Sequence, residues 1–410
     1  MRKYIKLRLS LLVFLQFFVP GITCPIMTLY LMNYLGYSGE RAGVVLSVSG
    51  ITTIISSILG TMLSNKFFTV KKLYGLCHLS AGIFMLIYVS QKNFIAVLVM
   101  YVLYTLAYGC TNGCVSAIIF ENQSNSKKDF GSIQMWGSVG WIFAGSLYSY
   151  IWMRGVTGQE ATLRLAIGLR FAALVSIIIF LYSLTLPDNK IDVVTNRKSK
   201  IPIEAIQILK KPKNLVIAVY EFLVFASFQY YLFAIGPFLQ QAKYKEVLLM
   251  PIMSIAQFSE AIALAILGYF ILKKGFKKVL IVGLCFNLWR FLALSISQSV
   301  PVVISALICH GLSSAFFYSG ALVYLDANCD DDVARPGIQQ IISILSYGIG
   351  ASVGNLFGGK MTNIFENSKT GYVNYTYFWG TQFIICLVLF IIFISLFEKY
   401  GTQKLERMEM

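Results

Sequence analysis

The sequence predicts an all-α membrane protein with twelve transmembrane helices in two six-helix pseudo-repeats. Of its 410 residues, 57% are hydrophobic and only 13% are charged. A soluble domain carries about twice that share of charged residues. The apolar residues occur in long runs, and a spanning helix needs about 20 of them in succession. One long polar stretch near the middle of the chain separates six runs from six runs.

The apolar runs are separated by polar turns or by glycine and proline. The first run follows a basic N-terminus and continues past Pro20 to about residue 35, which is too long for a cleaved signal peptide. We therefore expect it to be the first spanning helix. The twelve predicted segments lie near 9–33, 42–63, 73–90, 94–118, 131–152, 163–186, 214–240, 249–272, 279–298, 301–325, 335–358 and 376–397.

The positions of the lysines and arginines predict the orientation in the membrane. The N-terminus, the even-numbered connections and the C-terminal tail hold 24 of the 34 basic residues, whereas the opposite side holds 8. Basic residues favour the cytoplasmic side, so both termini are expected in the cytoplasm. The formal net charge of +16 comes from these short clusters. It therefore indicates contact with a lipid bilayer and does not indicate nucleic-acid binding.

The longest polar stretch runs from Pro187 to Asn214 and is rich in lysine and arginine. It predicts an N-terminal six-helix bundle at 1–187, a cytoplasmic linker at 188–213 and a C-terminal six-helix bundle at 214–410 with a short cytoplasmic tail. Within the linker, Ile201–Leu209 could form a short helix on the membrane surface.

Several classes of function lack support in the sequence. The chain has two histidines, and its eight cysteines do not have zinc-type spacing, so we expect no metal site. It contains no Walker loop for ATP and no cluster of polar residues typical of a membrane enzyme. We therefore expect a monomer that is not an enzyme and needs no cofactor.

A short repeat and several longer stretches resemble known transporters. Gly60 to Lys72 resembles the signature of the major facilitator superfamily, with Ser64 or Asn65 in place of its acid, and Gly268 to Lys278 repeats the pattern in the second half. Longer stretches resemble the nucleoside:proton symporter family, the bacterial nucleoside permeases. These stretches are Phe14-Leu-Gln-Phe17, Leu76-Cys-His78, Trp136-Gly-Ser-Val-Gly140, Ile252-Met-Ser-Ile-Ala-Gln-Phe-Ser-Glu260 and Leu288-Trp-Arg-Phe291.

The resemblance implies a major facilitator fold in a bacterial inner (cytoplasmic) membrane. It implies a secondary active transporter that imports nucleosides by proton symport with alternating access. A second interpretation stays open, because an aromatic and amide lining also suits other polar solutes. In that case the chain is a proton-coupled transporter of a sugar, an oligosaccharide or a muropeptide.

The resemblance also implies substrate-binding residues in the seventh and eighth segments. Gln257 and Glu260 lie three residues apart on one helix face and correspond to a glutamine and glutamate pair of the family's nucleoside site. Gln229 corresponds to a binding glutamine. The family's next binding residue, an asparagine, is Leu232 here, and Tyr231 or its neighbour Tyr230 could replace it.

The fifth segment holds Gln134, Ser138 and Trp141 on one helix face. The resemblance places arginine, threonine and phenylalanine at these positions in the family. Ser138 keeps a hydroxyl group and Trp141 keeps an aromatic ring that can stack on a base. Gln134 lacks the positive charge of the family's arginine, so it cannot form the ion pair that an arginine can form.

The tenth segment departs further from the family. His310 takes the place of a tyrosine, and Ser314 and Ala315 replace a phenylalanine and aspartate pair. Two residues are therefore candidates for proton coupling. Glu260 could titrate in a desolvated cavity, and His310 has a side chain that titrates near neutral pH. His310 could equally be a neutral residue that binds a substrate hydroxyl or a neighbouring helix.

Two further charged residues lie deep in the predicted membrane segments. Glu221 lies about two turns into the seventh segment, and Arg290 lies about three turns into the ninth. A charge in the middle of the bilayer costs about 2.5–3.5 kcal/mol on insertion scales. A structural ion pair and a gate are both consistent with these positions, and we favour structural roles.

Overall fold

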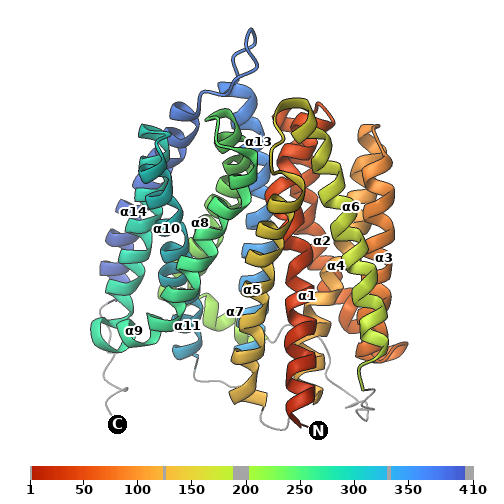
Figure 1. Cartoon of the computed structure of the whole chain (residues 1–410). Helices are drawn as coiled ribbons and strands as arrows, with labels where there is room; N and C mark the ends of the chain where they lie inside the picture. Colours follow the sequence, from red (N-terminus) through yellow and green to blue (C-terminus); the bar gives the residue numbers. More distant parts are fainter. Residues whose placement is uncertain (1, 123–125, 188–202, 330–333, 402–410) are drawn as a thin grey trace. The chain divides into compact units, whose positions relative to one another are not determined.

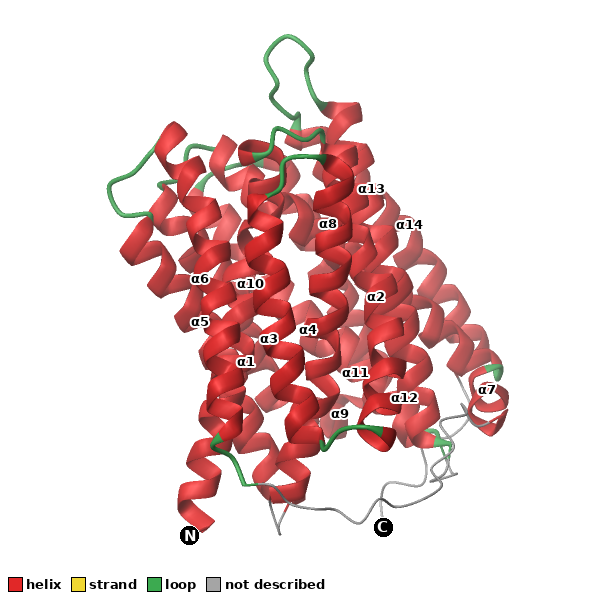
Figure 2. Ribbon diagram, turned by 90° about the vertical axis from the view of Figure 1, so that its right-hand side faces the viewer, coloured by secondary structure: helices red, strands yellow, loops and turns green. Residues whose placement is uncertain are grey.

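The computed structural model describes residues 2–122, 126–187, 203–329 and 334–401. In these ranges Figure 2 shows helices joined by loops, and the β-structure is one isolated bridge between Glu366 and Val373. The elements are α1 (Arg2–Leu29), η1 (Tyr30–Tyr34), α2 (Gly39–Lys66), α3 (Val70–Ser90), α4 (Phe94–Asn122), α5 (Ser126–Trp152), α6 (Gly158–Leu184), α7 (Ile203–Leu209), α8 (Pro212–Gln241), α9 (Glu246–Ile296), α10 (Val300–Ser313), η2 (Ser314–Ser319), α11 (Gly320–Ala327), α12 (Arg335–Ser343), η3 (Ile344–Gly350), α13 (Ala351–Phe365) and α14 (Tyr375–Gly401).

The helices have the lengths that a membrane requires. Among the described residues, ten are long and apolar enough to cross a bilayer. One of these, α9, has 51 residues and contains a non-helical residue at Gly275, with φ of 75° and ψ of 158°, so it comprises two spans. The helix α5 has 27 residues and is not among the ten. Counting both spans of α9 and including α5 is consistent with the predicted twelve-helix fold.

Local sequence determines several helix ends. The side-chain oxygen of Ser38 accepts a hydrogen bond from the backbone N–H of Arg41 at the start of α2. Thr69 caps α3 in the same way. The positive φ of Gly275 is a backbone conformation that favours glycine, and it lies where the sequence predicts a break between two segments. The helix α7 confirms a helix at the end of the predicted linker, whereas residues 188–202 lie outside the described residues.

Contacts divide the chain into two compact units. The first comprises Met1–Lys198, Gln229–Ser254 and Ala351–Asn363, and the second comprises Ser199–Phe228, Ile255–Gly350 and Ile364–Met410. In the first unit, α1 packs against α5 and α6, α3 packs against α4 and α6, and α2 packs against α4 (Figure 1). The predicted division into six-helix bundles at 1–187 and 214–410 stays a prediction.

Glycines allow close helix packing in the first unit. A Cβ atom added at Gly140 of α5 would overlap the backbone carbonyl group of Phe14 in α1, and one at Gly21 of α1 would lie 2.7 Å from the backbone oxygen of Trp141. The two helix backbones are therefore in direct contact, which is typical of helix packing in membranes.

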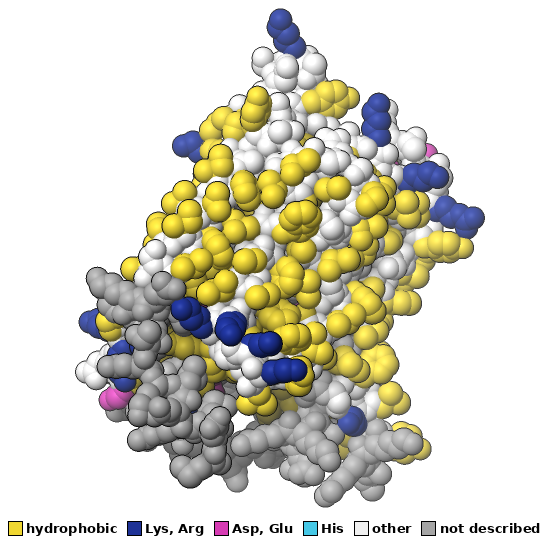
Figure 3. All heavy atoms as spheres, turned by 90° about the vertical axis from the view of Figure 1, so that its left-hand side faces the viewer, with side chains coloured by type: hydrophobic (Ala, Val, Ile, Leu, Met, Phe, Trp, Pro, Cys, Tyr) yellow, Lys and Arg dark blue, Asp and Glu magenta, His cyan; other side chains and the backbone are white. Residues whose placement is uncertain are grey.

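Apolar side chains also cover the outside of the protein. Figure 3 shows hydrophobic side chains over the middle of one face, with lysines and arginines towards its ends. A broad apolar band that ends in basic residues is the surface expected for a protein that lies in a lipid bilayer.

The contact of α1 with α5 leads to a prediction. We expect Gly140→Ala to destabilise the protein by about 1–3 kcal/mol, because the new methyl group forces the two backbones apart. The matched control is Gly113→Ala in α4, where an added Cβ meets no atom within 4 Å. This control should be neutral or stabilising, because alanine favours helix. Thermal unfolding in detergent measures both, and equal stability of the two variants would contradict the expectation.

Candidate functional site

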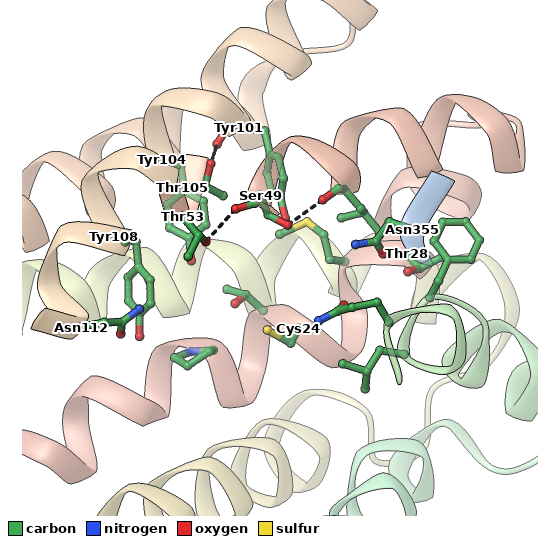
Figure 4. Close-up of a pocket in the computed structure, with 18 residues that line it drawn as sticks. Cys24, Thr28, Ser49, Thr53, Tyr101, Tyr104, Thr105, Tyr108, Asn112 and Asn355 are labelled. Carbon is green, nitrogen blue, oxygen red and sulfur yellow. Dashed lines mark hydrogen bonds between the residues drawn. The ribbon is translucent and has the colours of Figure 1, made fainter. Parts of the chain in front are cut away.

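A cavity of about 230 Å³ lies in the first unit among α1, α2, α4, α8 and α13. Eleven of the 18 lining residues carry a hydroxyl or a side-chain amide group, and none of the 18 is charged (Figure 4). It is lined by Pro20, Thr23, Cys24, Met27, Thr28, Leu46, Ser49, Thr53, Tyr101, Tyr104, Thr105, Tyr108, Gly109, Asn112, Gln229, Leu232, Phe233 and Asn355. This set offers hydroxyl groups, amides and aromatic rings to a ligand.

Three tyrosines form a ladder along the cavity side of α4. The ring centroids of Tyr101 and Tyr104 are 6.2 Å apart, and those of Tyr104 and Tyr108 are 5.9 Å apart with an interplanar angle of 29°. The spacing of three and then four residues places them on one helix face. Such a ladder can stack on a flat ring and also present phenolic hydroxyl groups to it.

Small hydroxyl side chains complete this part of the wall. Ser49 and Thr53 of α2 each donate a hydrogen bond of 2.7 Å to a backbone carbonyl group of their own helix, and Thr105 of α4 does so at 2.8 Å. Because their protons are engaged, these hydroxyl oxygens can accept hydrogen bonds from a ligand. The wall therefore suits a neutral ligand that carries several hydroxyl groups.

A buried hydrogen-bond network joins α4 to α1 and α3 next to the cavity. Gln16 of α1 is fully buried, and its Nε2 donates to the Thr111 hydroxyl oxygen at 2.8 Å and to Asn112 Oδ1 at 3.2 Å. Its Oε1 lies 2.9 Å from the hydroxyl group of Tyr74, which donates to it, and 2.6 Å from His78 Nε2. The network thus fixes the position of Asn112 in the cavity wall.

Tyr108 of the cavity belongs to the same network. Its hydroxyl group donates to the backbone carbonyl of Gln16 at 2.8 Å and accepts from Gln16 Nε2 at 3.3 Å. On the far side, His78 Nδ1 lies 2.9 Å from the Ser176 hydroxyl oxygen of α6. One amide therefore connects α1, α3 and α4, and through His78 it also reaches α6.

The second unit contains a carboxylate site. Ser314, the first residue of η2, donates a hydrogen bond of 2.6 Å to Glu260 Oε1 of α9. Gly311 makes this approach possible, because a Cβ there would overlap the backbone of Ala256 and Glu260. Gln257, one turn before Glu260, has a buried Oε1 that lacks a hydrogen-bond partner. Its oxygen is therefore available to a donor.

Arg290 and His310 form a second polar site in this unit. Both side chains are almost fully buried, and the Arg290 guanidinium donates to His310 Nδ1 and to Asn287 Oδ1. It also lies 4.3 Å from the ring centroid of Phe291. An arginine is always charged and can only donate, so His310 accepts at Nδ1 and is neutral. A proton on Nδ1 would break this bond and place two positive charges together.

The predicted site residues fall into both units. In the first unit, Gln229 lines the cavity, whereas Tyr231 of the same helix is buried at 1% exposure and is not part of its wall. The α5 residues are also not part of that wall. Gln134 and Trp141 are half-buried and Ser138 is exposed. The second unit contains Gln257, Glu260 and His310, and also Glu221 and Arg290.

Sequence reasoning missed the contributions of α1, α2 and α4 to the cavity. The signals were present as a face of tyrosine, threonine and asparagine in the apolar helix α4 and as a run of serines and threonines in α2. It also named Ser314 only as a replacement for a family residue, whereas the structure makes it the partner of Glu260.

Within the described parts of the chain, no group of three or more histidine, cysteine, aspartate or glutamate residues is arranged to hold a metal ion.

Comparisons with known proteins agree with the sequence resemblance. A family model described as "Nucleoside H+ symporter" matches residues 3–402. The chain is 25% identical to the putative nucleoside transporter YegT of Escherichia coli, over 97% of this chain and 94% of that protein. It is 23% identical to the nucleoside permease NupG of Escherichia coli over 96% of each chain. It is 24% identical to the xanthosine permease of Escherichia coli over 98% of each chain.

The fold is similar to solved transporter structures. The crystal structure of the nucleoside transporter NupG matches with a TM-score of 0.84 and 22% identity, over 96% of this chain and 99% of that one. A bacterial homologue of the human lysosomal transporter Spinster matches with a TM-score of 0.76 and 13% identity, over 98% and 97% of the two chains. At these identities the likeness shows the fold.

The network around Gln16 leads to a prediction. We expect Gln16→Leu to destabilise the protein by about 1–3 kcal/mol, because Thr111 and Tyr74 lose a buried hydrogen-bond partner. The matched control is Gln91→Leu at the end of α3, where the amide donates only to a carbonyl group of its own helix. Thermal unfolding in detergent compares the two, and a Gln16 variant as stable as the control would refute the role of the network.

Proposed function

Because the chain belongs to the nucleoside H+ symporter family, we propose that it is a secondary active transporter that imports nucleosides together with protons. Family membership rests on the family model, which matches nearly the whole chain. Transport would follow alternating access, in which a central site opens to each side of the membrane in turn. The chain is a multi-pass membrane protein, and its activity is transport rather than catalysis.

The uncharged cavity of the first unit is the observation that carries this proposal. A nucleoside combines a flat aromatic base with a ribose that bears hydroxyl groups. The tyrosine ladder of α4 suits the base, and the serine and threonine hydroxyl groups of α2 and α4 suit the ribose. Gln229 and Asn112 carry amides that can both donate to and accept from a base edge. The lack of charge in the wall favours a neutral solute.

Glu260 is the proposed site of the coupling proton. Its carboxyl group is half-buried and accepts a hydrogen bond from the Ser314 hydroxyl group. A carboxyl group in such a place can exist as a neutral acid or as an anion that the hydroxyl group stabilises. His310 is a weaker candidate because the Arg290 guanidinium occupies its Nδ1. We propose that His310 and Arg290 have a structural role.

The remaining assignments are proposals as well. We propose that Gln134, Ser138 and Trp141, together with Tyr231 and Gln257, contact substrate in some state of the cycle. The distribution of lysine and arginine supports two cytoplasmic termini in a bacterial inner membrane. We also propose that the functional unit is a monomer in the lipid bilayer.

A second candidate function is proton-coupled transport of another neutral polar solute. The same uncharged wall supports it, because sugars also stack on aromatic rings and bind amides and hydroxyl groups. A sugar, an oligosaccharide or a muropeptide fragment without net charge would fit this chemistry.

Uptake into proteoliposomes tests the proposed function. We expect purified protein to accumulate labelled nucleosides when the outside is acidic, and we expect accumulation to vanish when an uncoupler removes the proton gradient. A panel of labelled sugars and muropeptides is measured in parallel. Protein-free liposomes are the control. Sugar uptake without nucleoside uptake would favour the second candidate function. Nucleoside accumulation that stays the same after the uncoupler removes the proton gradient would refute symport.

Cys24 permits a test of the cavity itself. This free cysteine of α1 is exposed and lines the cavity. We expect a small methanethiosulfonate reagent to inhibit uptake, because the added group occupies the cavity, and we expect saturating substrate to slow the inhibition. The matched variant Cys24→Ser should transport normally and resist the reagent. If substrate gives no protection while the serine variant is resistant, the substrate does not bind in this cavity.

A further inference from the structure

Asn112 lies at one end of the tyrosine ladder in the cavity wall. It follows Tyr108 by four residues on the same face of α4, and both side chains line the cavity. Figure 4 shows the two at one end of the labelled residues, with Ser49 and Thr53 further along. The Asn112 side chain is exposed, so a ligand in the cavity can reach it. An amide can turn either its oxygen or its nitrogen towards a ligand, so its orientation decides what it binds.

The buried amide of Gln16 has one possible orientation. Its Nε2 lies 2.8 Å from the Thr111 hydroxyl oxygen and 3.3 Å from the Tyr108 hydroxyl oxygen. Both hydroxyl groups give their own protons to backbone carbonyl groups, at 2.6 Å and 2.8 Å. They can therefore only accept here, and only the nitrogen of Gln16 can donate to them. The other end agrees, because Gln16 Oε1 accepts from the Tyr74 hydroxyl group at 2.9 Å.

Gln16 in turn determines the orientation of Asn112. Gln16 Nε2 lies 3.2 Å from Asn112 Oδ1 and donates to it. If the Asn112 amide turned round, its amino group would face the amino group of Gln16, and neither could accept. Asn112 Oδ1 is therefore held towards Gln16, and Asn112 Nδ2 is left to donate to a ligand in the cavity.

The other asparagine of the wall has the opposite polarity. Asn355 of α13 donates from Nδ2 to the backbone carbonyl of Ala351 at 2.9 Å, so its Oδ1 is the atom that can bind a ligand. The serine and threonine hydroxyl groups of α2 and α4 also act as acceptors, as described above. Asn112 is thus a fixed donor in a wall that mostly accepts.

The spacing along α4 suggests which part of a nucleoside meets this donor. Thr105 and Asn112 are seven residues apart, which is two turns and about 10 Å along the helix axis. A ribose at the hydroxyl groups of Thr105, Ser49 and Thr53 would place the base over the ring of Tyr108. The base edge remote from the ribose would then face Asn112.

We propose that Asn112 is a specificity-determining residue that donates from Nδ2 to a carbonyl oxygen on this remote base edge, and that Gln16 is the positioning residue that holds it in that orientation. The preferred substrates are nucleosides with a carbonyl group there, such as inosine and uridine. Their counterparts with an amino group, adenosine and cytidine, would bring two donors together without an acceptor. The inference rests on the proposed nucleoside transport.

The test compares two nucleosides on one preparation of protein. Uptake of labelled inosine and labelled adenosine into proteoliposomes gives the ratio of their kcat/KM values, and uridine and cytidine give a second, independent ratio. Loss of folded protein lowers both rates equally, so a merely structural effect leaves each ratio unchanged. The variants are Asn112→Leu, which removes the donor, and Gln16→Leu, which releases the Asn112 amide. The matched control is Asn122→Leu in the same helix, because Asn122 donates to the Ile118 carbonyl and does not line the cavity.

We expect the wild type to prefer inosine over adenosine, and uridine over cytidine, by about five- to tenfold, which is the effect of one hydrogen bond. Both ratios should fall to about one in Asn112→Leu and Gln16→Leu, and the control should keep the wild-type ratios. If Gln16→Leu yields no folded protein, Gln16→Glu replaces it with the same expected result, because it keeps the side-chain volume and the acceptor for Tyr74 but loses the donor to Asn112.

Three outcomes would contradict these expectations in different ways. A wild type that transports adenosine as well as inosine or better overturns the inference, and so do wild-type ratios in Asn112→Leu. Wild-type ratios in the Gln16 variant overturn its positioning role. A wild type that transports no nucleoside overturns the proposed function instead.

Discussion

Each buried polar group in this apolar chain needs a partner that the protein itself supplies, because a lipid bilayer offers none. The helices meet this constraint for the backbone, and a few side-chain networks meet it for the rest. Gln16 shows the principle in the first unit. One amide uses both of its ends to hold groups from α3 and α4, and the oriented groups then form part of a cavity wall. The hydrogen bonds that give these buried polar groups their partners therefore also position the residues of the cavity wall.

The two units meet the constraint with different chemistry. The first unit uses neutral amides, hydroxyl groups and a histidine, so its cavity can bind a neutral solute without placing a charge in the membrane. The second unit contains the buried arginine and two deep carboxyl groups. Arg290 donates to the neutral acceptors His310 and Asn287 and lies against the face of Phe291.

The positions of the helices could be predicted from the sequence, because long apolar runs and glycine or proline breakers directly reflect the requirements of a bilayer. Gly275 is an example, since its backbone conformation ends one span and begins the next. The residues that surround the cavity could not be predicted in the same way. Whether Tyr104 faces a ligand or a neighbouring helix depends on the rotation of α4, and that rotation depends on side-chain packing. The π-helical turns that carry Tyr318 and Tyr347 were also not predictable, because they arise where tertiary packing overrides the usual helical hydrogen bonding.

The resemblance to the family also concerns the charged residues inside the membrane. The resemblance implies an arginine and a membrane aspartate in the family at the positions of Gln134 and Ala315, and by that correspondence the chain lacks one charge of each sign. The loss of both the arginine and the aspartate leaves neither charge without its partner. It also removes one acid that could bind the driving proton. In the structure, Glu260 accepts a hydrogen bond from Ser314, which lies in the same π-helical turn as Ala315. Glu260 is therefore an acid with a polar partner at this turn despite the substitution, and a carboxyl group with a hydroxyl partner can exist in either protonation state.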